Sequence, residues 1–229
     1  MIYLVIGRRK KGKTTLARYL SLRTQQRVSI DPRGLLPRES TFIVSDGRSA
    51  ETALQNNVPD ITLVPRRDTQ HDYERTIEAV ANSIEKHPPL SFTLLIDETR
   101  FIPDLLTSGL DWILRCSDPE CINIILTCHR PQDVKTDIRA IADNWLMFQM
   151  TQQHDIKVVE GKSEHAARLL PRLPDRHFID WNDAEGKLTV FSDPKTWYVP
   201  LRSVGTHEER AEQLIEGGKI QHEREPELF

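Results

Sequence analysis

The chain has 229 residues, of which 38% are hydrophobic and 28% are charged, and its net charge is −3. This length suits one domain, or one domain with an appendage, and the negative charge argues against a protein that coats polyanions generally, although a local basic patch could still contact DNA. No apolar run approaches the ~18 residues that a membrane-spanning helix needs, and the N-terminal run is too short for a signal peptide, so we expect a cytoplasmic protein with no membrane span.

The first predicted elements are a strand, a glycine loop and a helix. Ile2–Ile6 is a short apolar run suited to a buried strand, and residues 16–20 have helical spacing. Between them, residues 7–14 read Gly-Arg-Arg-Lys-Lys-Gly-Lys-Thr, which matches the phosphate-loop pattern G-x-x-x-x-G-K-[ST] in its required context. The sequence therefore predicts a site for the triphosphate of ATP.

Each loop position has an expected role. The glycines let backbone N–H groups approach phosphate oxygens, Lys13 should reach the β- and γ-phosphates, and the Thr14 hydroxyl should ligate Mg²⁺. The predicted nucleotide-binding residues are Gly7, Arg8, Arg9, Lys10, Lys11, Gly12, Lys13, Thr14 and Thr15. The four consecutive cations exceed what ATP binding requires, so they either lie in solvent or contact a neighbouring subunit or DNA.

Strands and helices then alternate along most of the chain. Further strands are expected at residues 27–31, 41–45, 61–64, 92–96, 122–127 and 145–150, with helices at 72–86, 104–115 and 133–142. Residues 177–181 and 188–191 predict an antiparallel hairpin, and residues 206–216 a last helix.

This pattern indicates an α/β fold. We expect the three-layer sandwich of P-loop NTPases, with a mostly parallel central sheet and antiparallel edge strands. The ATPase domain is placed at residues 1–200. Residues 201–229 would form a C-terminal helix and a charged tail, which is either frayed or an arm that grips a neighbouring subunit.

An acidic pair follows the strand at 92–96 and has the form of a Walker B element. Asp97 would hold the Mg²⁺ shell, and Glu98 would orient and polarise the attacking water. A glutamate at this position favours hydrolysis of ATP over its storage or over phosphoryl transfer.

A third polar element follows the next strand, where residues 126–131 read Leu-Thr-Cys-His-Arg-Pro. His129 is the candidate that senses the γ-phosphate. Multi-subunit ATPases often need a further positive charge from a neighbour. Arg115 is the candidate for that role, and Arg100 and Arg139 are the alternatives.

Taken in order, these elements and the turn Asp31-Pro32-Arg33-Gly34 resemble the FtsK/HerA superfamily of DNA-pumping ATPases. His129 stands where that family typically has glutamine. Since the sequence shows no large extra domains, the chain is similar to the genome-packaging ATPases of tectivirus-type, membrane-containing viruses.

The resemblance implies a homo-hexameric ring around double-stranded DNA, with ATP sites between subunits and Arg115 acting in trans. It also implies DNA contacts without sequence readout, for which the pairs at 10–11 and 66–67 are candidates, and a capsid or portal-vertex partner, so the protein would be cytoplasmic or virion-associated.

Other readings stay open. A zonular-occludens-type phage export ATPase usually carries a membrane span, and a cellular HerA-like DNA-processing ATPase carries extra domains. A small-molecule kinase would need an arginine-rich lid and an acceptor pocket, and Glu98 argues against a slow nucleotide switch.

Overall fold

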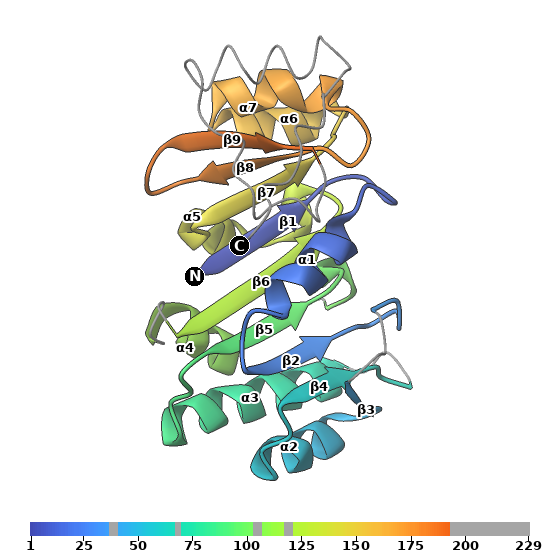
Figure 1. The fold of residues 1–229 in the computed structure, drawn as a ribbon, viewed down its shortest axis with the longest axis vertical. Coiled ribbons are helices and arrows are strands. Elements are labelled where there is room, and N and C mark those ends of the chain that lie inside the picture. Colours follow the sequence, from blue (N-terminus) through green and yellow to red (C-terminus); the bar gives the residue numbers. More distant parts are fainter. Residues whose placement is uncertain (37–40, 67–69, 103–106, 117–120, 193–229) are drawn as a thin grey trace, which may run out of the picture.

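A nine-stranded sheet runs through the centre of the computed structural model, which describes residues 1–36, 41–66, 70–102, 107–116 and 121–192 (Figure 1). The strands in the described ranges are β1 (Ile2–Ile6), β2 (Gln26–Ile30), β3 (Phe42–Val44), β4 (Asp60–Leu63), β5 (Phe92–Ile96), β6 (Ile122–Cys128), β7 (Asn144–Phe148), β8 (Phe178–Asn182) and β9 (Lys187–Phe191). The α-helices there are α1 (Lys13–Ser21), α2 (Gly47–Gln55), α3 (Gln70–Lys86), α4 (Ser108–Cys116), α5 (Thr136–Ile141), α6 (Gln153–Glu160) and α7 (Glu164–Leu169). Short 3₁₀ turns lie at η1 (Thr99–Phe101), η2 (Pro131–Asp133) and η3 (Leu170–Arg172).

The strand order across the sheet is β3-β4-β2-β5-β6-β1-β7-β8-β9. The pairs from β3 to β7 are parallel, whereas β7–β8 and β8–β9 are antiparallel. This confirms the mostly parallel sheet with antiparallel edge strands. Because β5, β6 and β1 are neighbours, and parallel strands end at the same edge, the segments that follow these three strands meet there.

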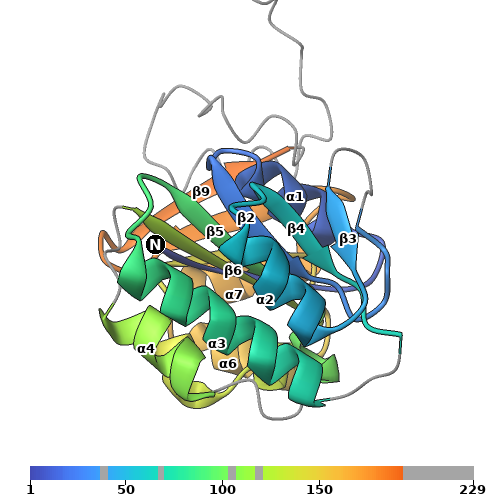
Figure 2. The same ribbon diagram turned by 90° about the horizontal axis from the view of Figure 1, so that it is seen from below.

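Both faces of the sheet are apolar and carry helices (Figure 2). Successive side chains of β1 alternate, so that Leu4 and Ile6 join one core cluster and Val5 the other. Helix α1 covers the Val5 face with Leu16 and Leu20. Apolar side chains of α2 to α7 pack into the core of the opposite face. The predicted three-layer α/β arrangement is therefore confirmed.

The predicted helix over residues 133–142 was wrong in its first three residues, because α5 spans Thr136–Ile141. The Asp133 carboxylate accepts hydrogen bonds from the backbone N–H groups of His129, at 3.2 Å, and Arg130, at 2.9 Å. It therefore closes the turn after β6. Val134 is then extended, with φ −115° and ψ 134°, and buried. The helix α5 starts only after this residue.

Three helices, α2, α6 and α7, were not predicted. They have 9, 8 and 6 residues, and few of their buried side chains are large and apolar: Leu54 in α2, Val159 in α6 and Leu169 in α7. The apolar signal in the sequence is therefore weak. Side-chain caps mark two of them: Asp46 Oδ1 accepts from Ser49 N at 2.8 Å, and Ser163 Oγ accepts from Ala166 N at 3.2 Å. Each cap satisfies a backbone donor at the helix start.

Several predictions lie outside the described residues. These are the start of the helix expected at 104–115, the basic residue Arg67, the helix at 206–216 and the tail at 201–229. Of the helices in the described ranges, none combines the length and the apolar character needed to cross a membrane.

Candidate nucleotide-binding and hydrolysis site

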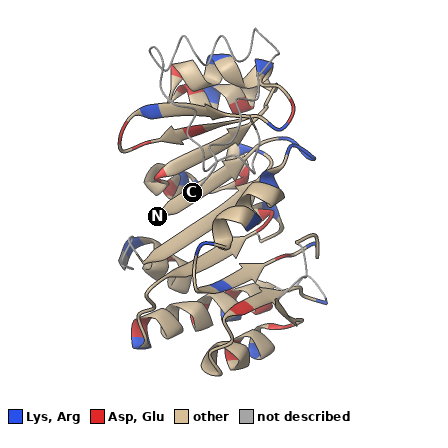
Figure 3. Cartoon of the chain, in the orientation of Figure 1, with Lys and Arg blue, Asp and Glu red and all other residues tan. Residues whose placement is uncertain are grey.

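The phosphate loop joins β1 to α1 and requires glycine at both of its ends. Gly7 has φ 144°, and a Cβ atom there would lie 2.6 Å from Cβ of Phe148 on the neighbouring strand. Gly12 has φ 109° and precedes the first turn of α1. Both backbone conformations disfavour a side chain. Figure 3 shows the segment between these glycines as a continuous basic stretch.

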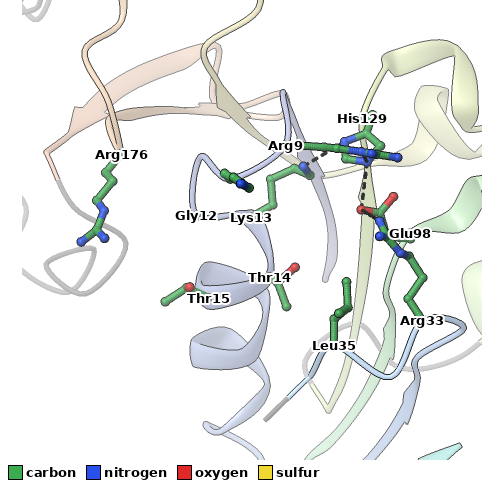
Figure 4. A pocket seen from close by; sticks show the side chains of 11 residues that line it. Arg9, Gly12, Lys13, Thr14, Thr15, Arg33, Leu35, Glu98, His129 and Arg176 are labelled. Atoms are coloured by element: carbon green, nitrogen blue, oxygen red, sulfur yellow. Dashed lines mark hydrogen bonds and ion pairs between the residues drawn. The ribbon is translucent and has the colours of Figure 1, made fainter. Parts of the chain in front are cut away.

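A cavity of about 630 Å³ opens over the loop (Figure 4). This volume falls within the usual range for small-molecule sites. The lining residues are Arg9, Lys10, Gly12, Lys13, Thr14, Thr15, Arg33, Leu35, Glu98, His129 and Arg176. The structure thus gathers most of the predicted site residues around one cavity, from three separate parts of the chain.

The other three loop residues, Gly7, Arg8 and Lys11, are not among those that line the cavity. The backbone oxygen of Arg8 accepts a hydrogen bond from Lys13 Nζ at 3.1 Å, and the backbone oxygen of Gly7 lies 3.4 Å from His129 Nδ1. Lys11 turns to the chain before β8, where its Nζ lies 2.8 Å from Asp175 Oδ1. Lys11 therefore joins two segments of the fold.

His129 connects Lys13 to Glu98. Its Nδ1 lies 3.2 Å from Lys13 Nζ, and its Nε2 lies 3.0 Å from Glu98 Oε1 (Figure 4). Burial and the positive charge of Lys13 lower the pKa of His129 below its ordinary value. The lowered pKa favours the neutral imidazole. The tautomer with its proton on Nε2 matches the two shorter contacts, because Nδ1 then accepts from Lys13 and Nε2–H donates to Glu98, while Arg9 Nε lies further away, 3.4 Å from Nε2.

Two guanidinium groups lie near Glu98. Arg33 Nη1 is 3.9 Å from Oε1, and Arg100 Nε is 3.8 Å from Oε2. Both guanidinium groups also lie over the ring of Phe101, at 5.8 and 4.7 Å from its centroid. Glu98 itself has φ 56°, an uncommon conformation for a residue with a side chain. Such outliers cluster at active sites.

Thr127, near the end of β6, holds the acidic pair in place. Its Oγ1–H donates to Asp97 Oδ1 at 2.6 Å, and its Oγ1 accepts from Glu98 N at 2.9 Å. All three residues are buried. The threonine of the third sequence element therefore orients the Walker B pair on the adjacent strand, a role that the sequence analysis missed.

Burial raises the pKa of Asp97 to about 6, against the opposing effect of the Thr127 hydrogen bond. The folded state therefore favours the protonated carboxyl, and the free energy of unfolding should fall as pH rises from 3.8 to about 6.

We expect Asp97→Asn to raise the free energy of unfolding by about 2–3 kcal/mol above pH 7. The gain should vanish near pH 4. Urea unfolding at pH 8 and pH 4 measures both, and an equal gain at the two values would contradict the burial argument.

The residues fit a bound Mg²⁺. Thr14 lines the cavity, and Asp97 Oδ2 is a buried carboxylate oxygen for which the described residues supply no hydrogen-bond partner. Hydroxyl and carboxylate oxygens are ligands that Mg²⁺ prefers, directly or through water.

Arg115 is placed far from the cavity of its own chain. It ends α4, where it is about half exposed and its Nε lies 2.6 Å from Asp111 Oδ1. Since α4 leads into the amino end of β6, the seven residues of that strand, about 20 Å, separate Arg115 from the edge with the phosphate loop. Among the described residues of the same chain, Arg33 and Arg100 approach Glu98 to within 4 Å.

Arg33, Leu35 and Arg176 line the cavity but were not predicted as site residues. The turn Asp31-Pro32-Arg33-Gly34 was noted without a role. It follows β2, which pairs with β5, so Arg33 comes beside Glu98. The turn was visible in the sequence, but its place beside Glu98 follows only from the order of the strands.

Neither protein-family models nor curated proteins match the chain. Solved structures do. The genome packaging NTPase B204 from Sulfolobus turreted icosahedral virus 2, in complex with ATP-gammaS, aligns with a TM-score of 0.69 at 18% identity, over 84% of this chain and 97% of that one. The chain shares the fold of this packaging NTPase.

Two more structures extend the comparison. VirB4 of Thermoanaerobacter pseudethanolicus aligns with a TM-score of 0.61 at 9% identity, over 84% of this chain and 88% of that one. The pCW3 conjugation coupling protein TcpA aligns with a TM-score of 0.51 at 14% identity, over 93% of this chain and 64% of that one. The resemblance inferred from the motifs is thereby confirmed at the level of the fold.

Proposed function

We propose that the protein is an ATP-hydrolysing motor that translocates double-stranded DNA and packages a viral genome into a preformed capsid. The observation that carries the ATPase part is the contact chain Lys13–His129–Glu98 at one end of the cavity. It joins a phosphate-binding cation to the candidate water-orienting carboxylate through one imidazole. DNA packaging is supported by the fold shared with B204 and by the motif order.

In this mechanism Lys13 exchanges His129 for the β- and γ-phosphates of ATP. Glu98 orients the attacking water and accepts its proton. His129 then loses its contact with Lys13 and keeps its contact with Glu98. The position of Glu98 therefore depends on whether the γ-phosphate is bound. Thr14 and Asp97 would hold Mg²⁺, which would neutralise phosphate charge when bound.

The protein acts as a homo-hexamer in this proposal, and Arg115 of a neighbouring subunit completes the site. Its exposed position on α4 is accessible to another subunit. A cation supplied in trans stabilises the charge of the transition state. Basic side chains in the ring contact DNA phosphates without reading sequence, and a capsid or portal-vertex protein is the proposed docking partner.

The test is ATP turnover with and without linear double-stranded DNA, measured alongside the size of the oligomer. We expect Mg²⁺-dependent turnover that DNA stimulates, a ring-sized assembly, and DNA binding that weakens steeply with salt. A monomer that ignores DNA and phosphorylates a small acceptor would refute the motor.

The alternatives are a zonular-occludens-type export ATPase and a cellular HerA-like DNA-processing ATPase. Fractionation of infected or producing cells separates them from the packaging motor. A packaging motor should sediment with preformed capsids, an export ATPase should fractionate with membranes and coat protein, and a cellular enzyme should do neither.

A further inference from the structure

The segment before β8 lies beside the phosphate loop, although more than 150 residues separate them in the chain. Strand β8 is antiparallel to β7, with Phe148 paired to Phe178. The first residue of β8 is therefore at the edge of the sheet where β7 ends. Since β7 also pairs with β1, residues 171–177 reach the same edge as the phosphate loop (Figure 1).

Specific contacts fix this segment in place. Lys11 Nζ lies 2.8 Å from Asp175 Oδ1, and that bond lowers the pKa of the Asp175 carboxyl. Gln149 Nε2 donates to the backbone oxygen of Pro171 at 3.2 Å. His177 N donates to the backbone oxygen of Pro174 at 3.2 Å and closes a turn. The turn is thus tied both to the phosphate loop and to the chain after β7.

Arg176 stands in this turn with φ 61°. This left-handed conformation is natural for glycine and tolerable for asparagine, but it is uncommon and strained for arginine. Strained residues of this kind mark functional positions more often than chance. The side chain of Arg176 lines the cavity, so the strained residue presents its guanidinium to the candidate site.

The cavity has two chemically different ends. Glu98 and His129 lie at one end, beside Lys13, whereas Arg176 lies at the other, past Gly12 and Thr15 (Figure 4). Phosphate-loop chemistry sets the direction of ATP: the lysine and the Walker B pair take the terminal phosphates. The base and ribose then extend over the start of α1 toward Arg176.

We propose that Arg176 binds the nucleoside part of ATP, with its guanidinium plane stacked on the purine base. This inference rests on the proposed function, because it takes the orientation of ATP from it. A planar guanidinium stacks on aromatic faces and interacts with their π-electrons, which a lysine ammonium does less well. The pairing of β8 with β7 brings the turn to this edge of the sheet, and the Lys11–Asp175 ion pair links it to the phosphate loop.

The test compares two ligands of the full-length protein by calorimetry: a non-hydrolysable ATP analogue and inorganic tripolyphosphate, both with Mg²⁺. Arg176→Gly suits the positive φ, so the fold should be retained, as thermal unfolding will show. We expect this variant to bind the analogue roughly fivefold more weakly, the scale of one cation–π contact, while its affinity for tripolyphosphate stays unchanged. Arg172→Ala, an exposed arginine on the same segment, is the matched control and should change neither affinity.

The outcomes separate the two proposals. Equal weakening toward both ligands would mean that Arg176 contacts phosphate, and no weakening toward either would mean that it contacts neither; both results overturn the nucleoside contact and leave the ATPase proposal standing. If the wild-type protein binds neither ligand, the proposed function fails and the Arg176 contact fails with it.

Discussion

Glu98→Gln should abolish most ATP turnover while ATP binding is retained. The amide is nearly isosteric with the carboxylate, and its oxygen can still accept a hydrogen bond from His129 Nε2, which lies 3.0 Å from Glu98 Oε1. It cannot accept the proton of the attacking water. General-base catalysis typically contributes about 10²–10⁴-fold, so the rate of steady-state phosphate release should fall by a factor on that scale.

Nucleotide affinity is the second readout for this variant. Removing the negative charge of Glu98 relieves its repulsion of phosphate, so the ATP analogue should bind at least as tightly as it does to the wild type. Glu160→Gln, an exposed change at the end of α6, is the matched control for the loss of one carboxylate and should hydrolyse ATP normally. Normal turnover in Glu98→Gln would show that another group orients the water.

Lys13→Ala should instead remove binding itself. Lys13 is a buried residue, and its Nζ lies 3.1 Å from Arg8 O and 3.2 Å from His129 Nδ1, where phosphate oxygens can replace both partners. A hydrogen bond to a charged group is worth about 1.5–3 kcal/mol, so affinity for the ATP analogue should fall by roughly 10- to 100-fold.

The pattern of loss distinguishes Lys13 from Arg176. Lys13→Ala should weaken tripolyphosphate and the ATP analogue alike, because it acts on the phosphates that both ligands share. Lys157→Ala, which removes an exposed lysine from α6, controls for net charge and should leave both affinities unchanged. An affinity for tripolyphosphate that survives in Lys13→Ala would contradict the assigned role of this lysine.

The sequence by itself predicted features that neighbouring residues encode together. The phosphate loop could be recognised because its glycines, lysine and threonine lie within eight consecutive positions between a strand and a helix. The apolar strands were recognisable because both of their faces are buried, as the cores on either side of β1 confirm. An acidic pair at the end of such a strand completed the local signal.

Prediction from the local sequence failed where a polar residue closes a turn in place of starting a helix, and where a helix is short. Asp133 looked like a helix start, yet its carboxylate closes the turn after β6. The short helices α6 and α7 carry too few apolar residues for a visible period, and their burial depends on the sheet that they cover.

Only the tertiary structure decided which side chains share the cavity. The order β2-β5-β6-β1 brings Arg33, Glu98 and His129 to Lys13, and it separates Arg115 from them by the length of a strand. The antiparallel return of β8 delivers Arg176 to the far end of the same cavity. The physical reason is that a chain segment records its own periodicity and turns, whereas strand order follows from how all the apolar faces are buried at once.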